Sequence, residues 1–144
     1  MAGLIVLGVT LALATVLGLI LRGRAGRLRA QKGKGRAGMD VGEPLGERAT
    51  LVQFSTAFCQ PCRATRRVLG EVAAMVPGVR HIEIDAESRL DLVRAYGVLR
   101  TPTVFVLDKS GNIVKRASGQ PRKADVIAAL GHAVDSPSHQ PDGA

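Results

Sequence analysis

The sequence predicts an α/β fold with a mixed central sheet flanked by helices, preceded by one N-terminal transmembrane helix. Three observations predict it. The first 21 residues carry no charged side chain. Apolar patterns then follow over about 95 residues in the order strand, helix, strand, helix, strand, strand, helix. A helix between the first two strands favours parallel pairing, whereas a short polar turn between the last two favours an antiparallel hairpin.

The composition excludes several classes of protein. A hydrophobic content of 46% among 144 residues is too high for a disordered chain. One Tyr, three Phe and no Trp argue against recognition of single-stranded nucleic acid by base stacking. The net charge of +8 is local, because residues 1–36 hold seven Lys and Arg and no Asp or Glu. We therefore predict no nucleic-acid partner.

The apolar start of the chain predicts a membrane anchor. A helix over residues 1–21 is about 30 Å long, which is the thickness of a hydrocarbon core. A cleavable signal peptide has a basic segment before a shorter apolar stretch. Here nothing basic precedes the apolar run, and Arg22 follows it directly. Buried core helices rarely run this long without a polar face, so we predict a helix that spans the membrane.

The basic residues after this helix predict its orientation. Seven of them lie within 15 residues of its end: Arg22, Arg24, Arg27, Arg29, Lys32, Lys34 and Arg36. By the positive-inside rule, we predict a single-pass cell-membrane protein whose following domain lies on the cytoplasmic face. The same cluster attracts anionic headgroups, which makes membrane lipid an expected partner. The Arg/Gly/Lys-rich residues 22–44 predict a flexible linker, and residues 135–144 predict a disordered tail.

A domain over residues 45–134 contains the predicted strands and helices. Its first strand is the apolar run Leu51–Phe54. The first helix begins at Pro61 and runs to about Val76, because proline fits the first turn of a helix. Its apolar stripe is formed by Val68, Leu69, Val72 and Val76. The second strand is Val79–Ile84, in which apolar and polar residues alternate.

The second half of the domain predicts a helix, a hairpin and a final helix. Ser88 is the expected cap of the helix, and Gly97 follows its end. The hairpin consists of Thr103–Leu107 and Ile113–Ala117, joined by turn-forming residues. The last helix covers about residues 123–134. Its expected buried residues are Ile127, Leu130 and Val134.

The only two cysteines, Cys59 and Cys62, lie between the first predicted strand and the helix after it. The unpaired N–H groups and positive end of that helix favour the thiolate of Cys59, the form that attacks a disulfide. The spacing places Cys62 one turn on, where it can attack a mixed disulfide. The alternatives are two inert cysteines or a zinc half-site. Zinc needs two more ligands, and the three histidines show no ligand spacing, so we predict no metal site.

A second motif, Arg100-Thr101-Pro102-Thr103, stands at the entry to the predicted hairpin. Proline has no N–H to donate to a sheet, so it fits the beginning of a strand. A cis Thr101–Pro102 bond would be a built-in feature of the fold. An ordinary trans proline at the start of a strand is the alternative.

Together these residues resemble the thioredoxin family. The matching positions are Phe54, residues 58–63, Asp85, residues 96–98, residues 101–103, Gly111 and Gly119. They cover about residues 45–134, and the spacing of 43 residues from Cys59 to Pro102 is that of thioredoxins proper. The basic, Ala/Gly-rich composition and the N-terminal anchor are also similar to those of small membrane-anchored actinobacterial thioredoxin-like proteins.

The resemblance implies a role for each matching residue. Cys59 would be the nucleophile and Cys62 the resolving cysteine of a protein-disulfide reductase, an enzyme that needs no bound cofactor. Pro102 would be the cis-proline that faces the disulfide. The expected substrate-binding residues are Phe58, Gln60, Pro61, Thr101, Pro102 and Gly119. The expected partners are protein disulfide substrates and, as electron donor, a thioredoxin reductase.

Several positions depart from the family pattern, and two of them bear on proton transfer at Cys62. Thioredoxins have an acidic residue six positions before the nucleophile, where this chain has Gln53, which cannot take a proton. His81 replaces the lysine usual near that acid. We hypothesise that deprotonation of Cys62 is slower, or that His81 or water acts as its base. A hydrogen-bonded Gln53–His81 pair without a catalytic role is the alternative.

The sequence thus predicts a membrane-anchored thiol–disulfide oxidoreductase that reduces protein disulfides from the cytoplasmic face. Two alternatives stay open. An extracytoplasmic thioredoxin-like reductase would serve cytochrome c or metal-site maturation, and membrane topology distinguishes it. A non-catalytic thioredoxin-fold module would bind or sense partners through the groove around Pro102, and turnover of a protein disulfide would eliminate it.

Overall fold

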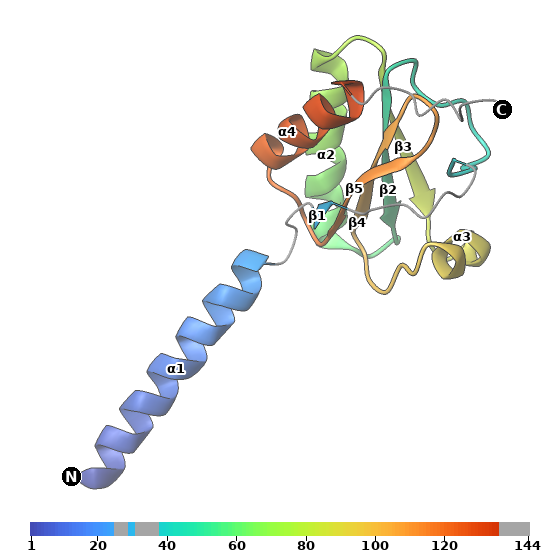
Figure 1. Ribbon diagram of the computed structural model, residues 1–144. Coiled ribbons are helices and arrows are strands. Elements are labelled where there is room, and N and C mark those ends of the chain that lie inside the picture. Colours follow the sequence, from blue (N-terminus) through green and yellow to red (C-terminus); the bar gives the residue numbers. More distant parts are fainter. Residues whose placement is uncertain (25–28, 31–37, 136–144) are drawn as a thin grey trace, which may run out of the picture.

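The computed structural model of the protein describes residues 1–24, 29–30 and 38–135 (Figure 1). After the N-terminal helix α1 (Ala2–Arg24) and the two-residue strand β1 (Arg29–Ala30), the expected strands and helices occur in the expected order. They are β2 (Ala49–Ser55), α2 (Gln60–Met75), β3 (Val79–Asp85), α3 (Leu90–Ala95), β4 (Thr103–Asp108), β5 (Ile113–Ser118) and α4 (Lys123–Asp135).

The sheet is mixed, as predicted, with the strand order β1-β5-β4-β2-β3. β2 pairs with β3 in parallel and with β4 antiparallel, and β4 pairs with β5 as an antiparallel hairpin. In this register Ser55 lies beside Asp85, and Phe54 lies beside Thr103. The ends of β2 and β3 and the beginning of β4 therefore share one edge of the sheet. The cysteine loop and Pro102 both adjoin this edge.

Helices cover both faces of the sheet, which confirms the α/β layering (Figure 1). α2 and α4 pack on one face through Leu69, Val72 and Leu130, against β-strand residues such as Val104. The other face is covered by α3 and by the segment before β2. Every residue of β2 is buried, as expected for a central strand with both faces covered.

Part of the expected linker, residues 22–44, belongs to the folded domain. β1 pairs antiparallel with β5, and Met39 and Val41 are buried in the core beside α3. The Met39 N–H also donates to the carbonyl of Gly111 over 2.8 Å. Two isolated apolar residues in a Gly-rich stretch show no periodicity, which is why sequence reasoning missed them. Residues 25–28 and 31–37, and residues 136–144 of the expected tail, lie outside the described residues.

Two expectations about helices were wrong. Ser88 does not cap α3: its hydroxyl donates to the Asp85 carboxylate, and Arg89 occupies the N-cap position without a side-chain cap. Ile127 is 43% exposed, because the buried residues of α4 follow a different helical row. That row consists of Val126, Ala129, Leu130 and Ala133.

Helix α1 is a candidate membrane span. Its residues Ala2–Gly23 are long and apolar enough to cross a membrane, and none of its apolar surface is buried within the protein. Figure 1 shows it projecting away from the sheet and its covering helices. Among the described residues it is the only helix that meets these requirements.

Candidate active site

The loop from β2 to α2 positions both cysteines. Cys59 is the N-cap of α2, and Cys62 lies in its first turn. The two side chains form a disulfide with an S–S distance of 2.10 Å and a Cα–Cα distance of 5.2 Å. Pro61 occupies the first turn of the helix, where its missing N–H costs no hydrogen bond. The helix therefore begins within the cysteine motif itself.

The two sulfur atoms have different surroundings. Cys62 is buried, with 1% of its surface exposed, whereas Cys59 is half-buried. The Cys62 N–H donates to Sγ of Cys59 over 3.2 Å. A donor in the first turn, together with the positive end of the helix, stabilises negative charge on that sulfur. Cys59 is thus the sulfur that an incoming disulfide can reach and the one best placed to carry a negative charge.

The second predicted motif lies beside the cysteine loop. The Thr101–Pro102 peptide bond is cis, and Pro102 is buried. The Pro102 carbonyl accepts a 2.7 Å hydrogen bond from the Gly119 N–H. Gly119 has a φ of +99°, which a side chain with a Cβ rarely adopts. The Thr101 hydroxyl lies 3.4 Å from the Thr56 hydroxyl, which connects the two loops.

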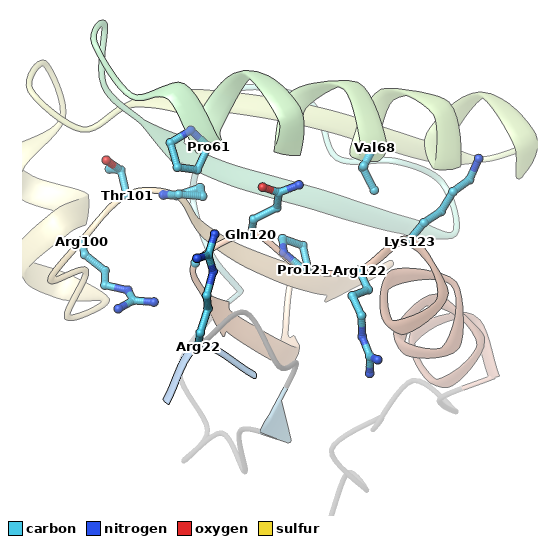
Figure 2. Close-up of a pocket in the computed structure, with 11 residues that line it drawn as sticks. Arg22, Pro61, Val68, Arg100, Thr101, Gln120, Pro121, Arg122 and Lys123 are labelled. Atoms are coloured by element: carbon cyan, nitrogen blue, oxygen red, sulfur yellow. The ribbon is translucent and has the colours of Figure 1, made fainter. Parts of the chain in front are cut away.

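A groove of about 780 Å³ opens next to these loops (Figure 2). Four of the predicted substrate-binding residues line it: Pro61, Thr101, Pro102 and Gly119. Phe58 is 97% exposed and, like the exposed Gln60, is not among the lining residues. The structure therefore brings most of the predicted set together beside the cysteines. The substrate-binding role of all six residues stays a prediction.

The buried polar pair predicted beneath the cysteines is present. The Gln53 side chain is fully buried and donates through Nε2 to the Cys62 carbonyl over 2.9 Å. Its Oε1 lies 3.2 Å from Nε2 of His81. Because an amide oxygen can only accept a hydrogen bond, the Nε2 of His81 must carry the proton. Burial lowers the pKa of His81, opposed by the negative charge of Glu83. The pair acts on Cys62 through its backbone, and its role in proton transfer stays a prediction.

The comparisons with known proteins agree with this geometry. The sequence model of the thioredoxin family matches residues 42–132, which is more than half of the chain. The chain belongs to the thioredoxin family. A thioredoxin of Mycolicibacterium smegmatis is 33% identical over 87 residues, which are 58% of this chain and 77% of the relative. Thioredoxin-2 of Pyricularia oryzae is 30% identical over 83 residues, which are 57% of this chain and 48% of the relative.

The match to several thioredoxins covers only part of their length. Two thioredoxins of rice, Oryza sativa, are matched over 62% and 53% of their own chains. Among solved structures, a mutant thioredoxin from Halobacterium salinarum has a TM-score of 0.57 at 21% identity, over 63% of this chain and 79% of that one. A thioredoxin from Nicotiana alata has a TM-score of 0.55 at 24% identity, over 62% and 76%. At these identities the structures support the thioredoxin fold alone.

Sequence reasoning missed Glu83, an acidic residue on the same face of the sheet as Gln53 and His81 in this thioredoxin domain. Glu83 forms an ion pair with Arg66 of α2 and accepts a hydrogen bond from the Ser55 hydroxyl. The hydrogen bond from Arg66 is the main reason why the pKa of Glu83 lies below its usual value. The sequence did contain a signal for this residue. Side chains two positions apart on a strand point to the same face of the sheet, which groups Gln53 and Ser55 of β2 with His81 and Glu83 of β3.

Sequence reasoning included Arg100 in the second motif but gave no charged residue a place in the groove. Arg22, Arg100, Arg122 and Lys123 all contribute to it. Arg100 directly precedes Thr101, and Arg122 and Lys123 follow Gly119 closely, so proximity in sequence to these two predicted substrate-binding residues was the available signal. No group of three or more His, Cys, Asp or Glu residues that could hold a metal ion occurs in the described part of the chain.

Proposed function

We propose that this thioredoxin-family protein is a membrane-anchored thiol–disulfide oxidoreductase that reduces disulfides of other proteins. One observation carries the proposal. A cysteine pair lies at the beginning of α2, with Cys59 half-buried and Cys62 buried, beside a groove lined by Pro61 and Pro102. This arrangement offers a reactive sulfur, a second sulfur one turn away, and a surface on which a substrate can bind.

The chemistry balances without a bound cofactor. In the dithiol form, the Cys59 thiolate attacks one sulfur of the substrate disulfide, and the other substrate sulfur leaves as a thiolate. The Cys62 thiolate then attacks Cys59 in the mixed disulfide and releases the second substrate thiolate. The Cys59–Cys62 disulfide forms as two electrons pass to the substrate. A flavin-containing thioredoxin reductase is the electron donor that we propose for the return to the dithiol.

Gln53 and His81 belong to the proposed second step. Burial lowers the pKa of His81 and so favours its neutral form, and its Nε2–H is engaged by Gln53, so Nδ1 is the nitrogen that can accept a proton from Cys62 through water. We expect His81→Gln, which retains a donor but cannot titrate, to slow release of the mixed disulfide and to flatten the rise of its rate with pH below about pH 6.5, where the lowered pKa of His81 lies. An unchanged pH–rate profile would reject this role and leave the pair as a structural contact.

Turnover is the first test of the proposal. The full chain, reduced beforehand, should reduce a disulfide-containing protein, and Cys59→Ser should abolish the reaction. Cys62→Ser should accumulate the mixed disulfide on Cys59, which intact-protein mass spectrometry detects as an added mass. If the wild-type chain reduces no protein disulfide, the protein is a binding or sensing module rather than an enzyme.

Location is the second test. α1 is the proposed anchor, and the basic residues after it favour a cytoplasmic domain. Because Cys59 and Cys62 are the only cysteines, a membrane-impermeant maleimide reports on the active site alone. We expect both thiols to be labelled only after lysis. Labelling of intact cells would place the domain outside and make an extracytoplasmic reductase the better account.

A further inference from the structure

The groove beside the cysteines has a strongly one-sided charge. Its lining includes four cationic side chains and no acidic one: Arg22, Arg100, Arg122 and Lys123. They come from three different parts of the chain, namely the last turn of α1, the segment before β4, and the beginning of α4. In Figure 2 the side chains of Arg100 and Arg122 stand on either side of Arg22. Convergence of separate elements distinguishes this cluster from a run of basic residues in sequence.

Acidic neighbours balance only part of this charge. Arg122 forms an ion pair with Asp125, and Lys123 forms one with Glu71. Arg100 has no acidic partner among the described residues, and its guanidinium donates to the Ser118 carbonyl over 3.0 Å. The bond to a carbonyl orients the Arg100 side chain and leaves its charge uncompensated. A positive potential therefore persists at the open side of the groove.

The floor of the same groove is apolar and adjoins the disulfide. Pro61, Val68, Pro102 and Pro121 supply it, and Figure 2 shows Pro61 and Val68 pointing from α2 toward the segment that holds Gln120 and Pro121. Proline and valine side chains offer no hydrogen-bonding group, so this floor does not select a polar group. The other lining side chains, Thr101 and Gln120, are uncharged, and selection by charge therefore falls to the cationic rim.

We propose that the groove selects disulfides whose flanking residues are acidic. The inference rests on the proposed function and specifies its substrate class. Carboxylates match guanidinium groups in both charge and geometry, and Arg can bind them through two parallel hydrogen bonds. Charge complementarity raises association rates by about 10 to 10³ at low ionic strength, and salt reduces the effect. The preference therefore acts on the rate of the first thiol–disulfide step.

The test compares two peptides of equal length, each with one internal disulfide flanked by three Glu or by three Lys. The reduced full chain, in nanodiscs of phosphatidylcholine, is mixed with each peptide. The second-order rate constant for oxidation of the Cys59–Cys62 dithiol is measured. At about 20 mM salt we expect the Glu peptide to react about tenfold faster, and at about 1 M salt we expect the ratio to approach one.

Charge reversal at one position identifies the groove as the cause. Arg100→Glu should lower the ratio at least threefold and should accelerate the reaction with the Lys peptide. A gain in rate cannot result from misfolding. Lys109→Glu is the matched control, because Lys109 is exposed in the turn after β4, at the opposite end of the sheet. It changes the net charge equally and should leave the ratio unchanged.

The outcomes separate this inference from the proposed function. Equal rates for both peptides would overturn the acidic preference while the oxidoreductase stands, whereas no reaction with either peptide would overturn the oxidoreductase itself. The remaining outcome is that Arg100→Glu leaves the peptide ratio unchanged but weakens binding of the nanodisc-held chain to phosphatidylserine vesicles. The cationic rim would then bind anionic lipid headgroups rather than substrates. That result would also overturn the inference.

Discussion

Gln53 is at the centre of the buried polar contacts beneath the disulfide. Its amide group bonds the Cys62 carbonyl on one side and His81 on the other, and it is fully buried. A buried amide is tolerated because both of its ends have partners, and loss of one partner leaves the other group unsatisfied. The amide thus connects the first turn of α2 to β3 across the central strand.

Removal of the Gln53 amide should destabilise the domain. Gln53→Met keeps the side-chain volume but leaves the His81 N–H and the Cys62 carbonyl without these bonds, so we expect a loss of about 1–3 kcal/mol in the free energy of unfolding. A double-mutant cycle with His81→Ala isolates the contact between the two side chains. We expect the double variant to lose less than the sum of the singles, and additive losses would show that the contact contributes nothing.

His81 makes stability depend on pH near neutrality. Its pKa lies below the ordinary value of 6.5 because of burial, so the unfolded chain binds the proton at a higher pH than the folded chain does. The contribution is complete above about pH 6.5 and is lost as the pH falls through the folded value. Glu83, whose pKa is also lowered, titrates below 4.5 and does not interfere.

We therefore expect the Tm of the wild-type chain to fall between about pH 7.5 and 5.5, and the Tm of His81→Gln to fall less. Thermal unfolding followed by circular dichroism at the two pH values measures both changes. Equal falls in the two proteins would mean that another group carries the pH dependence. The variant retains a hydrogen-bond donor toward Gln53, so a similar Tm at pH 7.5 is its built-in control.

The parts of the site that lie in sequence motifs could be predicted from the sequence. The residues that reach the groove from separate loops could not. The position of the cysteine pair follows from its place between a strand and a helix, and that of Pro102 from the rule that proline begins a strand. Arg100 and Arg122 are 22 residues apart in sequence and lie in loops. Only the spatial arrangement of the β5–α4 connection beside the Pro102 loop brings them to one groove.

At the scale of elements, α4 shows how a helix face is misjudged. Apolar residues are abundant along it, so more than one row of positions could serve as the buried stripe. The structure buries Val126 and Leu130 and leaves Ile127 on the exposed side. Alanines at positions 129 and 133 complete the buried row and allow α4 to approach the sheet and α2 closely.

This arrangement predicts unequal effects of two truncations on α4. Leu130→Ala removes a side chain that is 3% exposed, and should cost about 2–5 kcal/mol because a cavity forms between α4 and the sheet. Ile127→Ala removes one that is 43% exposed, and should cost below about 1 kcal/mol. Unfolding by denaturant measures both values. Equal losses would mean that the helix lies with a different face toward the sheet.

Element order was more predictable than element boundaries. The seven elements from β2 to α4 follow from apolar periodicity, which reflects burial on one or both faces. The cap of α3 failed because the Ser88 hydroxyl has a nearby carboxylate, Asp85, that competes for it. Such competition depends on a turn whose geometry no local pattern of residues specifies.

At the scale of the whole molecule, the anchor and the domain have separate requirements. The two cores of the domain are built from residues between Met39 and Ala133, and α1 contributes to neither. The rest of the protein covers none of the apolar surface of α1. Only lipid or a partner protein can remove that surface from water. Stability of the domain should therefore be independent of the helix, whereas membrane association should depend on it.

A chain of residues 25–144 tests this separation, because it lacks α1 but keeps β1 and its pairing with β5. It also keeps the buried side chain of Met39 and the Met39 N–H that donates to the Gly111 carbonyl. We expect this shorter chain to stay in the soluble fraction and to unfold in a single cooperative transition. The full chain should sediment with membranes and resist extraction by alkaline carbonate, because its helix buries about 20 apolar residues in lipid. Carbonate extraction of the full chain would contradict α1 as a span, and sedimentation of the shorter chain would place the membrane contact in the domain.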